Sequence, residues 1–283
     1  MSDLSKNFKV NLEPTINSGQ VFLWEKIGKK WYGIDGDRVL VFDNEQKFEK
    51  NMKYESSFFR FDDNLLEISK ELGKDKNVKN ALKLYPDLRL TRQNPFQCYV
   101  SFIASSNSNI PNIKLRLKNL CKMFGKRTTI DNLDFFLFPS AHDLANATMS
   151  DIRKCGFGYR AKAIKSASIS VVNGEINFEE LKKIDYHKAK EKLLKIFGIG
   201  NKVADCVLLF SLEKLESFPL DRWMLRILQK YYSKKFQIST KTITEKTYDR
   251  LHENIIEYFG CYAGYAQQFL FKLERDLYGK KWL

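Results

Sequence analysis

The sequence predicts an α+β fold, in which a small N-terminal antiparallel β-sheet packs on a mainly α-helical domain. Short β-rich stretches occur between Val21 and Phe61, and a helical periodicity replaces them from Asn94 onward. Hydrophobic residues make up 43% of the 283 residues, which is enough for a packed core. We expect residues 1–92 to form the sheet domain with its connecting helix, and residues 93–283 to form the helical domain.

The β-rich stretches are VFLWEKI, KWYGI and RVLVF, and an Asp-Gly-Asp turn at residues 35–37 joins the last two. This pattern is typical of an antiparallel sheet. The charged segment ISKELGKDKNVKNALKLYPDLRL follows and favours a connecting helix. In the second domain, Pro95 and Pro111 stand where the first turn of a helix tolerates proline, so each indicates a helix start.

The charge balance indicates a nucleic-acid partner. The 48 Lys and Arg against 34 Asp and Glu give a net charge of +14, which attracts a polyanion. A basic surface also suits an anionic membrane, but no stretch approaches the roughly 18 apolar residues of a spanning helix. The start MSDLSKNFKV lacks the apolar core of a signal peptide. We expect a monomer that is cytoplasmic and nucleoid-associated. The Lys- and Asn-rich, Ala-poor composition of the chain favours a prokaryotic source with an AT-rich genome.

The cysteines argue against a metal centre. They are five in number, an odd count, and no two form a C-x-x-C pair: Cys98, Cys121, Cys155, Cys206 and Cys261. Neither a disulfide framework nor a zinc ribbon is indicated. The spacing also excludes a four-cysteine iron–sulfur cluster, because cluster ligands must converge on one small inorganic core. We expect no metal and no cofactor.

The most informative segment is LLKIFGIGNKVADCVLLF, residues 193–210. An apolar helix ends at Gly198, the chain turns through Gly-Ile-Gly, and a second helix begins. Gly198 and Gly200 allow a tight turn and a close approach to a ligand. Amides at the start of the second helix point outward, so a DNA phosphate can bind there. We predict a helix-hairpin-helix at about residues 190–211. From the glycines alone, a plain helical hairpin is an equal alternative.

Lys202 lies in the first turn of that second helix, where the helix dipole disfavours a cation. An amine that loses its proton there is a nucleophile able to form a Schiff base with a sugar carbon. Cys206 and Phe210 follow at i+4 and i+8, so the three side chains share one helical stripe. The alternatives are a solvated surface lysine and two ordinary core residues.

Asp221 follows 19 residues after Lys202, in FPLDRWMLRILQKYY, and precedes an amphipathic helix. Its simplest role is that of an N-cap. A carboxylate held by helix amides can also accept a proton from Lys202 or stabilise positive charge developing on a deoxyribose. Both roles are compatible with one residue.

At this point the sequence resembles a known family. GIG-x-KVADC followed by P-x-D is similar to the helix-hairpin-helix, Gly/Pro-Asp superfamily of DNA glycosylases. Within it, the chain from Ser18 to Phe271 resembles the 8-oxoguanine DNA glycosylase/AP lyase family. The segments that carry the resemblance occur in the family's order: SGQVFLW, RQNPFQCYVSFIASSNSNI, GFGYRAK, KVADC, FPLDRWM and GCYAGYAQQFLF. The resemblance implies base-excision repair of duplex DNA that contains an oxidised guanine, with base flipping, lysine attack at C1′ and β-elimination.

The resemblance also implies roles for single residues. Lys202 falls on the nucleophile and Asp221 on the catalytic aspartate. The carbonyl of Gly19 would accept the N7–H that 8-oxoguanine has and guanine lacks, a contact whose loss is costly in a buried pocket. The rest of the base pocket would comprise Gln267 on the Watson–Crick edge, Phe271 stacked on the base, Cys206 on its other face, and Phe210 in place of a methionine.

The resemblance places the wedge residues that fill the gap left by a flipped base at Asn107 and Tyr159, and an arginine that contacts the orphaned cytosine at Arg160. Two positions depart from the family. Asn112 replaces an arginine that contacts the orphaned cytosine, so we expect relaxed discrimination of the opposite base. Trp223 replaces a histidine and offers only an indole donor.

Two other functions share some of these features. An alkylated-base glycosylase of the same superfamily reads a cationic base by aromatic stacking and needs no lysine nucleophile, so Lys202, Gly19 and Gln267 argue against it. A non-catalytic helix-hairpin-helix module would bind DNA through the same charge and glycine turn. It would have no reason to keep Lys202 with Asp221.

Overall fold

The computed structural model describes residues 9–43, 53–236, 238 and 244–278. Its residues fall into two compact units, each built from segments distant in sequence. The first unit contains Met1–Gln20, Phe48–Arg92 and Leu208–Leu283, and the second contains Val21–Lys47 and Gln93–Val207. The chain passes from one unit to the other between Arg92 and Gln93, at the boundary that the sequence suggests. It also passes between the units at three other places. The two-domain division by residue number therefore stays a prediction.

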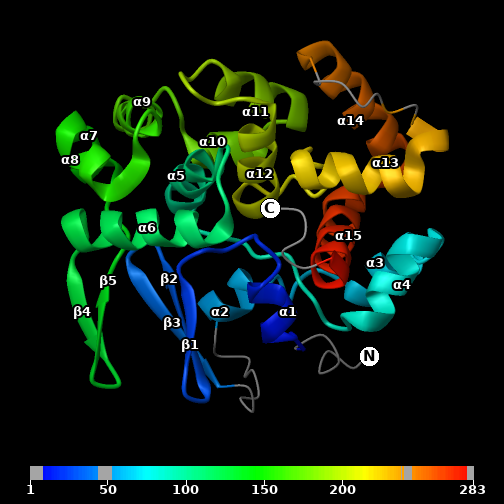
Figure 1. Cartoon of the computed structure of the whole chain (residues 1–283), viewed down its shortest axis with the longest axis horizontal. Coiled ribbons are helices and arrows are strands. Elements are labelled where there is room, and N and C mark those ends of the chain that lie inside the picture. Colours follow the sequence, from blue (N-terminus) through cyan, green and yellow to red (C-terminus); the bar gives the residue numbers. More distant parts are fainter. Residues whose placement is uncertain (1–8, 44–52, 237, 239–243, 279–283) are drawn as a thin grey trace. The chain divides into compact units, whose positions relative to one another are not determined.

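The second unit contains the antiparallel sheet that the sequence predicts. It has the order β1 (Trp24–Ile27), β2 (Lys30–Asp35) and β3 (Arg38–Asp43), coloured blue in Figure 1. Asp35 pairs with Arg38 across the predicted turn, in which Gly36 has φ +63°. Gly33 faces Trp24 so closely that a Cβ at this position would lie 2.0 Å from the indole ring.

A second hairpin, which the sequence analysis did not anticipate, is formed by β4 (Arg127–Ile130) and β5 (Leu133–Phe136). Phe135 of this hairpin stacks on Tyr32 of the sheet with ring centroids 5.3 Å apart. Lys30 and Asp131 form an ion pair at 2.7 Å between the same two elements. The sheet is thus extended by side-chain contacts to the hairpin.

The helices of the second unit begin where the sequence indicates. Both α5 (Pro95–Ser105) and α6 (Ile110–Phe124) have a proline in the first turn. Each is capped by the asparagine that precedes it, Asn94 or Asn109, whose side chain accepts a backbone N–H bond. The other helical segments of this unit are α7 (Ala141–Asn146), α8 (Met149–Ile152), a π-helix (Arg153–Phe157), α9 (Arg160–Val172), α10 (Phe178–Lys183), α11 (Tyr186–Leu194) and most of α12 (Asn201–Ser211).

Within its described residues, the first unit contains helices and no strand. It contains α1 (Leu12–Ile16), α2 (Lys53–Phe58), α3 (Leu65–Leu72), α4 (Lys76–Leu84), α13 (Arg222–Phe236), α14 (Glu245–Phe259) and α15 (Ala263–Tyr278). The connecting segment that the sequence predicts as one helix forms two, α3 and α4, and these belong to the unit of α15. Asp75 caps α4 and also accepts hydrogen bonds from Tyr232 and Tyr258, which ties α4 to α13 and α14. No helix among the described residues is long and apolar enough to span a membrane.

Candidate active site

The predicted hairpin forms from α11, a turn at residues 195–200, and α12. Gly198 has φ +84°, and a Cβ there would lie 2.4 Å from Cβ of Ala163, so both conformation and space require glycine. A Cβ on Gly200 would meet no atom within 4 Å. Gly200 is exposed, so the start of α12 is open on this side, and a phosphate needs such an opening to approach a helix N-terminus.

A buried ion pair joins the two helices of the hairpin. Lys190 of α11 lies 3.3 Å from Oδ2 of Asp205 on α12, and Tyr186 donates a hydrogen bond of 2.6 Å to Oδ1 of the same carboxylate. Lys190 also donates to the Tyr186 hydroxyl at 3.0 Å. All three side chains are buried. This network fixes the packing of α11 on α12, and hence the position of Lys202 on α12.

Lys202 lies in the first turn of α12 and is half-buried. Its Nζ donates a hydrogen bond of 2.7 Å to Oγ of Ser105, the last residue of α5, and lies 5.0 Å from the ring centroid of Phe102. Within the described ranges, no carboxylate forms an ion pair with this amine. Lys202 is thus a positioned amine, and the alternative of a solvated surface lysine does not describe it.

Cys206 and Phe210 follow Lys202 along α12 and are 2% and 3% exposed. Cys98 of α5 contacts the Cys206 carbonyl through its sulfur at 4.0 Å. The helical stripe that the sequence predicts is present, because the three residues are one turn apart on a continuous helix. Burial is compatible with both a core role and a pocket role for the last two residues.

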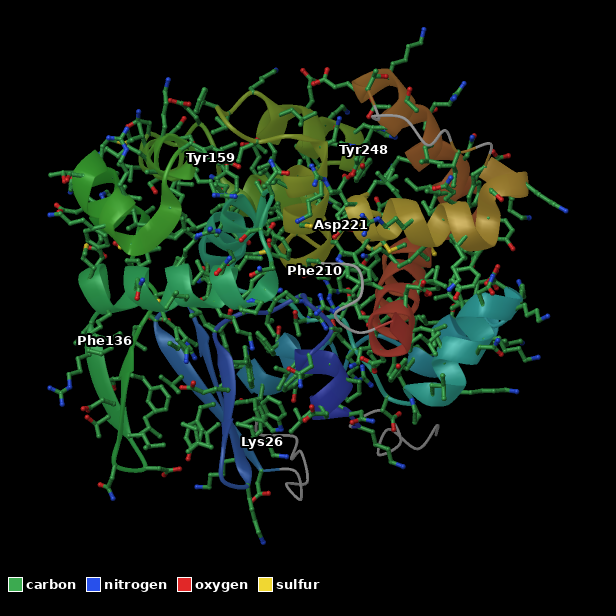
Figure 2. All side chains as sticks on the ribbon, viewed as in Figure 1. Lys26, Phe136, Tyr159, Phe210, Asp221 and Tyr248 are labelled. Carbon is green, nitrogen blue, oxygen red and sulfur yellow. The ribbon has the colours of Figure 1, made fainter. Side chains whose placement is uncertain are left out.

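Asp221 is the N-cap of α13, as the simpler interpretation of the sequence predicted. Its Oδ1 accepts the backbone N–H of Met224 at 2.8 Å, and the residue lies at the start of α13 (Figure 2). The cap fixes the carboxylate in one orientation, which a catalytic role also requires. Asp221 and Lys202 belong to different units, so their pairing stays a prediction.

Two residues of the predicted base pocket lie one turn apart on α15. Gln267 is 5% exposed, and its Oε1 is a buried acceptor with no hydrogen-bond partner among the described residues. Such an atom is costly unless a ligand satisfies it. Phe271 is 8% exposed. The adjacent Gln268 donates a 2.8 Å hydrogen bond to the carbonyl of Ser18, which brings the Gly19 turn to α15. Gly19 itself has φ +78°.

Phe271 is also part of a cluster with Trp223 and Arg275. The two rings meet edge to face, with centroids 6.4 Å apart. Cζ of Arg275 lies 5.7 Å from the Trp223 ring and 5.6 Å from the Phe271 ring. Burial lowers the pKa of Arg275, and the negative charge of Asp221 partly offsets this effect. Arg275 was not identified from the sequence, although its i+4 spacing from Phe271 was a usable signal.

The predicted wedge residues are brought together in the second unit. Arg160 donates hydrogen bonds to the carbonyls of Ser106, at 2.8 Å, and Asn107, at 3.0 Å. Its guanidinium lies 4.4 Å from the ring centroid of Tyr159, which is 68% exposed at the start of α9 (Figure 2). Asn107 is exposed and has φ +47°, a conformation rare for a residue with a Cβ.

Asn112 is exposed in the first turn of α6. Arg116, one turn further along α6, was not identified from the sequence. It donates hydrogen bonds to Oγ of Ser108, at 2.7 Å, and to the carbonyl of Gly156, at 2.9 Å. These bonds place a second arginine beside the wedge segment, one turn from the position where the resemblance expects it.

The described ranges contain no group of three or more His, Cys, Asp or Glu side chains that could hold a metal ion.

Comparison with known proteins identifies the family. Residues 4–99 match the 8-oxoguanine DNA glycosylase N-terminal domain, and residues 100–253 match the HhH-GPD superfamily of base excision DNA repair proteins. The structure of MBOgg1 in complex with a low-affinity DNA ligand is 31% identical, with a TM-score of 0.86 over 95% of this chain and 93% of that one. The chain belongs to the 8-oxoguanine DNA glycosylase family.

Other known proteins are similar to the chain in sequence and fold, or in fold alone. The Clostridium acetobutylicum 8-oxoguanine glycosylase/lyase, solved with duplex DNA containing cytosine opposite 8-oxoguanine, is 29% identical with a TM-score of 0.84, over 95% of this chain and 92% of that one. A probable N-glycosylase/DNA lyase of Methanothermobacter thermautotrophicus is 34% identical over 174 residues. That match covers 54% of this chain and 55% of the relative, about half the relative's length. The 3-methyladenine DNA glycosylase of Archaeoglobus fulgidus, 19% identical with a TM-score of 0.71 over 96% of this chain and 97% of that one, shares the fold.

Proposed function

We propose that this 8-oxoguanine DNA glycosylase family member is a bifunctional DNA N-glycosylase and AP lyase that removes 8-oxoguanine from duplex DNA. The observation that carries the proposal is the placement of Lys202. Its amine is held by Ser105 and Phe102 at the start of α12, beside a glycine turn that leaves room for a phosphate. A non-catalytic DNA-binding module needs the turn but has no use for the positioned amine.

The chemistry follows from the groups present. The duplex binds through its phosphates, and the oxidised nucleotide rotates out of the stack into the pocket. The neutral amine of Lys202 attacks C1′, the bond from C1′ to the base breaks, and the base leaves with the bonding electron pair. Opening of the sugar gives a Schiff base between Nζ and C1′. Loss of a proton from C2′ then expels the 3′ phosphate by β-elimination. Asp221 would stabilise positive charge on the sugar.

Recognition of the lesion rests on hydrogen bonds in a buried pocket. The Oε1 atom of Gln267 is a buried acceptor, and its NH₂ group supplies donors, so the side chain suits the Watson–Crick edge of a purine. The Gly19 carbonyl would accept N7–H of 8-oxoguanine, while the N7 lone pair of guanine would leave that acceptor unpaired. Phe271 offers a ring one turn away for stacking.

Borohydride trapping tests the proposal. Incubation of the protein with an 8-oxoguanine duplex and borohydride should give a covalent adduct, because the reductant converts the Schiff base into a stable amine. Lys202→Gln should form no adduct. Lys195→Gln is the matched control, because Lys195 lies in the same hairpin but is 68% exposed and paired with Glu191.

An adduct with Lys202→Gln would refute the assignment of the nucleophile. Release of 3-methyladenine in place of 8-oxoguanine would favour the alkylated-base alternative. No base release from either lesion would favour a DNA-binding module. The same assay with each of the four bases opposite the lesion would measure how far Asn112 relaxes the preference for cytosine.

A further inference from the structure

The Arg275 side chain stands beside the candidate catalytic carboxylate but is not paired with it. It lies on α15 one turn after Phe271 and is half-buried. Its guanidinium covers parts of two rings, those of Trp223 and Phe271, at distances of 5.7 and 5.6 Å. Two carboxylates, those of Asp221 and Asp276, are close enough to act on its charge. One oxygen of the Asp221 carboxylate, however, is bonded to the N–H of Met224.

The guanidinium of Arg275 makes no hydrogen bond to the residues that the structure describes. In the part of the chain that the structure describes, no hydrogen bond and no ion pair involves Arg275, although a guanidinium has five N–H donors. Two other cations of the same unit are bonded to carboxylates. Arg92 makes two bonds to Asp62 and two to Glu213, and Lys272, the neighbour of Phe271 on α15, pairs with Asp276 at 2.9 Å.

The rings hold the guanidinium in place. Contact with Trp223 and Phe271 restricts a long side chain that would otherwise lose its rotamer freedom on binding. Trp223 lies in the first turn of α13, where the positive end of the helix dipole also favours an anion. A fixed, unpaired guanidinium beside a helix N-terminus suits a bidentate contact with a phosphodiester group.

We propose that Arg275 binds a phosphodiester of the DNA strand that carries the damaged base, adjacent to the flipped nucleotide. The inference rests on the proposed function for its choice of ligand. Arg275 packs on Phe271, the ring on which the flipped base would stack. Its side chain would therefore connect the DNA backbone to the base pocket. Arg275 is therefore a positioning residue that fixes the sugar and phosphate while the base occupies the pocket.

A methylphosphonate scan tests this assignment. The ligand is a duplex with a tetrahydrofuran abasic-site analogue, in which one phosphate at a time is replaced by a neutral methylphosphonate. Binding to this duplex does not depend on base release, so it is independent of the glycosylase proposal. For the unaltered protein, one neutral position next to the analogue should weaken binding about 10-fold.

In Arg275→Gln, binding to the unmodified duplex should weaken by the same factor, and the same methylphosphonate should cause no further loss. The salt dependence of binding should also decrease by about 0.9 in the slope of log K against log salt. Arg275→Lys keeps the positive charge, so it should retain part of the affinity and part of the loss that the methylphosphonate causes. Arg250→Gln, which removes an exposed arginine from α14, is the matched control and should leave the scan unchanged.

Three outcomes of these experiments distinguish the inference from its alternatives. If the losses in Arg275→Gln and in the methylphosphonate duplexes are additive at every position, Arg275 contacts no phosphate and the inference is wrong. If Arg275→Gln does not fold, as judged by its thermal unfolding, Arg275→Lys is scanned instead, and a position-specific loss as large as in the unaltered protein would also refute the inference. A protein that shows the coupling but releases no 8-oxoguanine would contradict only the proposed function.

Discussion

Asp221 combines, in one side chain, a structural role that is observed and a catalytic role that is proposed. Asparagine also caps helices, so Asp221→Asn should keep the bond to the Met224 N–H and change the free energy of unfolding by less than about 1 kcal/mol. The substitution removes the negative charge, and loss of a group that stabilises developing charge costs roughly 100- to 1000-fold in rate. Single-turnover excision and urea unfolding, measured on the same variant, separate the two roles.

Asp221→Ala is the control for the cap, because it removes both the charge and the hydrogen bond and should destabilise the protein by about 1 kcal/mol more than Asp221→Asn. Unchanged excision by Asp221→Asn would reduce this residue to a cap.

Some features of the site residues depend on neighbours in the sequence, whereas others depend on contacts with residues far away in the sequence. Lys202 and Asp221 were identified because each stands at a helix start, and a helix start is recognised from a few adjacent residues. The partner of Lys202, Ser105, lies 97 positions away, and no short-range pattern reports that contact. Arg275 was missed for a related reason. Its spacing from Phe271 is visible, but the absence of a bonded partner becomes apparent only in the folded chain.

Elements were predictable to the extent that their turns have distinctive sequences. The Asp-Gly-Asp turn and the Gly-Ile-Gly turn both appear as predicted, because glycine is needed at the positive φ of Gly36 and Gly198. The β4–β5 hairpin turns through Asp131 and Asn132, which adopt φ +51° and +61° without a glycine. An Asp-Asn pair is a weaker signal than Asp-Gly, so this hairpin was not predicted.

The helix-hairpin-helix depends on the buried pair between Lys190 and Asp205. Lys190→Met removes the cation that offsets a buried carboxylate, and breaking such a pair costs about 3–5 kcal/mol. We expect urea unfolding to show a loss in this range. Because the pair holds α12, excision should fall as well. Lys188→Met is the matched control on the same helix. Its pair with Asp185 is 74% and 50% exposed, so removing it should change the stability little. Equal, small losses in the two variants would show that the pair does not hold the hairpin.

At the scale of the whole molecule, several charges of the first unit meet around Arg92, the last residue before the chain crosses into the second unit. Arg92 bonds Glu213 at 2.7 Å and Asp62 at 2.8 Å, and Arg60 lies 2.9 Å from Glu213. These contacts join the segment before Arg92 to the segment that follows α12. The first unit is built from three stretches of chain, so its stability depends on such connections.

The same contacts make stability depend on pH. Burial alone would raise the pKa of Glu213, but the hydrogen bond from Arg92 and the charges of Arg60 and Arg92 outweigh it, and the pKa lies below its ordinary value of 4.5. A carboxylate whose pKa is lowered in the folded state stabilises that state above its ordinary pKa, and this contribution is lost as the pH falls through the folded pKa. The free energy of unfolding should therefore decrease as the pH falls below about 4.5, the ordinary pKa of a glutamate.

Arg92→Gln tests the source of this dependence. The substitution removes the cation that lowers the pKa of Glu213, so the variant should be less stable at pH 6 and should lose less stability between pH 6 and pH 3 than the unaltered protein. Urea unfolding across this range measures both effects. Arg127→Gln is the control, because its pair with Asp134 is exposed on the β4–β5 hairpin and contributes little to stability. An unchanged pH dependence in Arg92→Gln would assign the acid sensitivity to carboxylates outside this cluster.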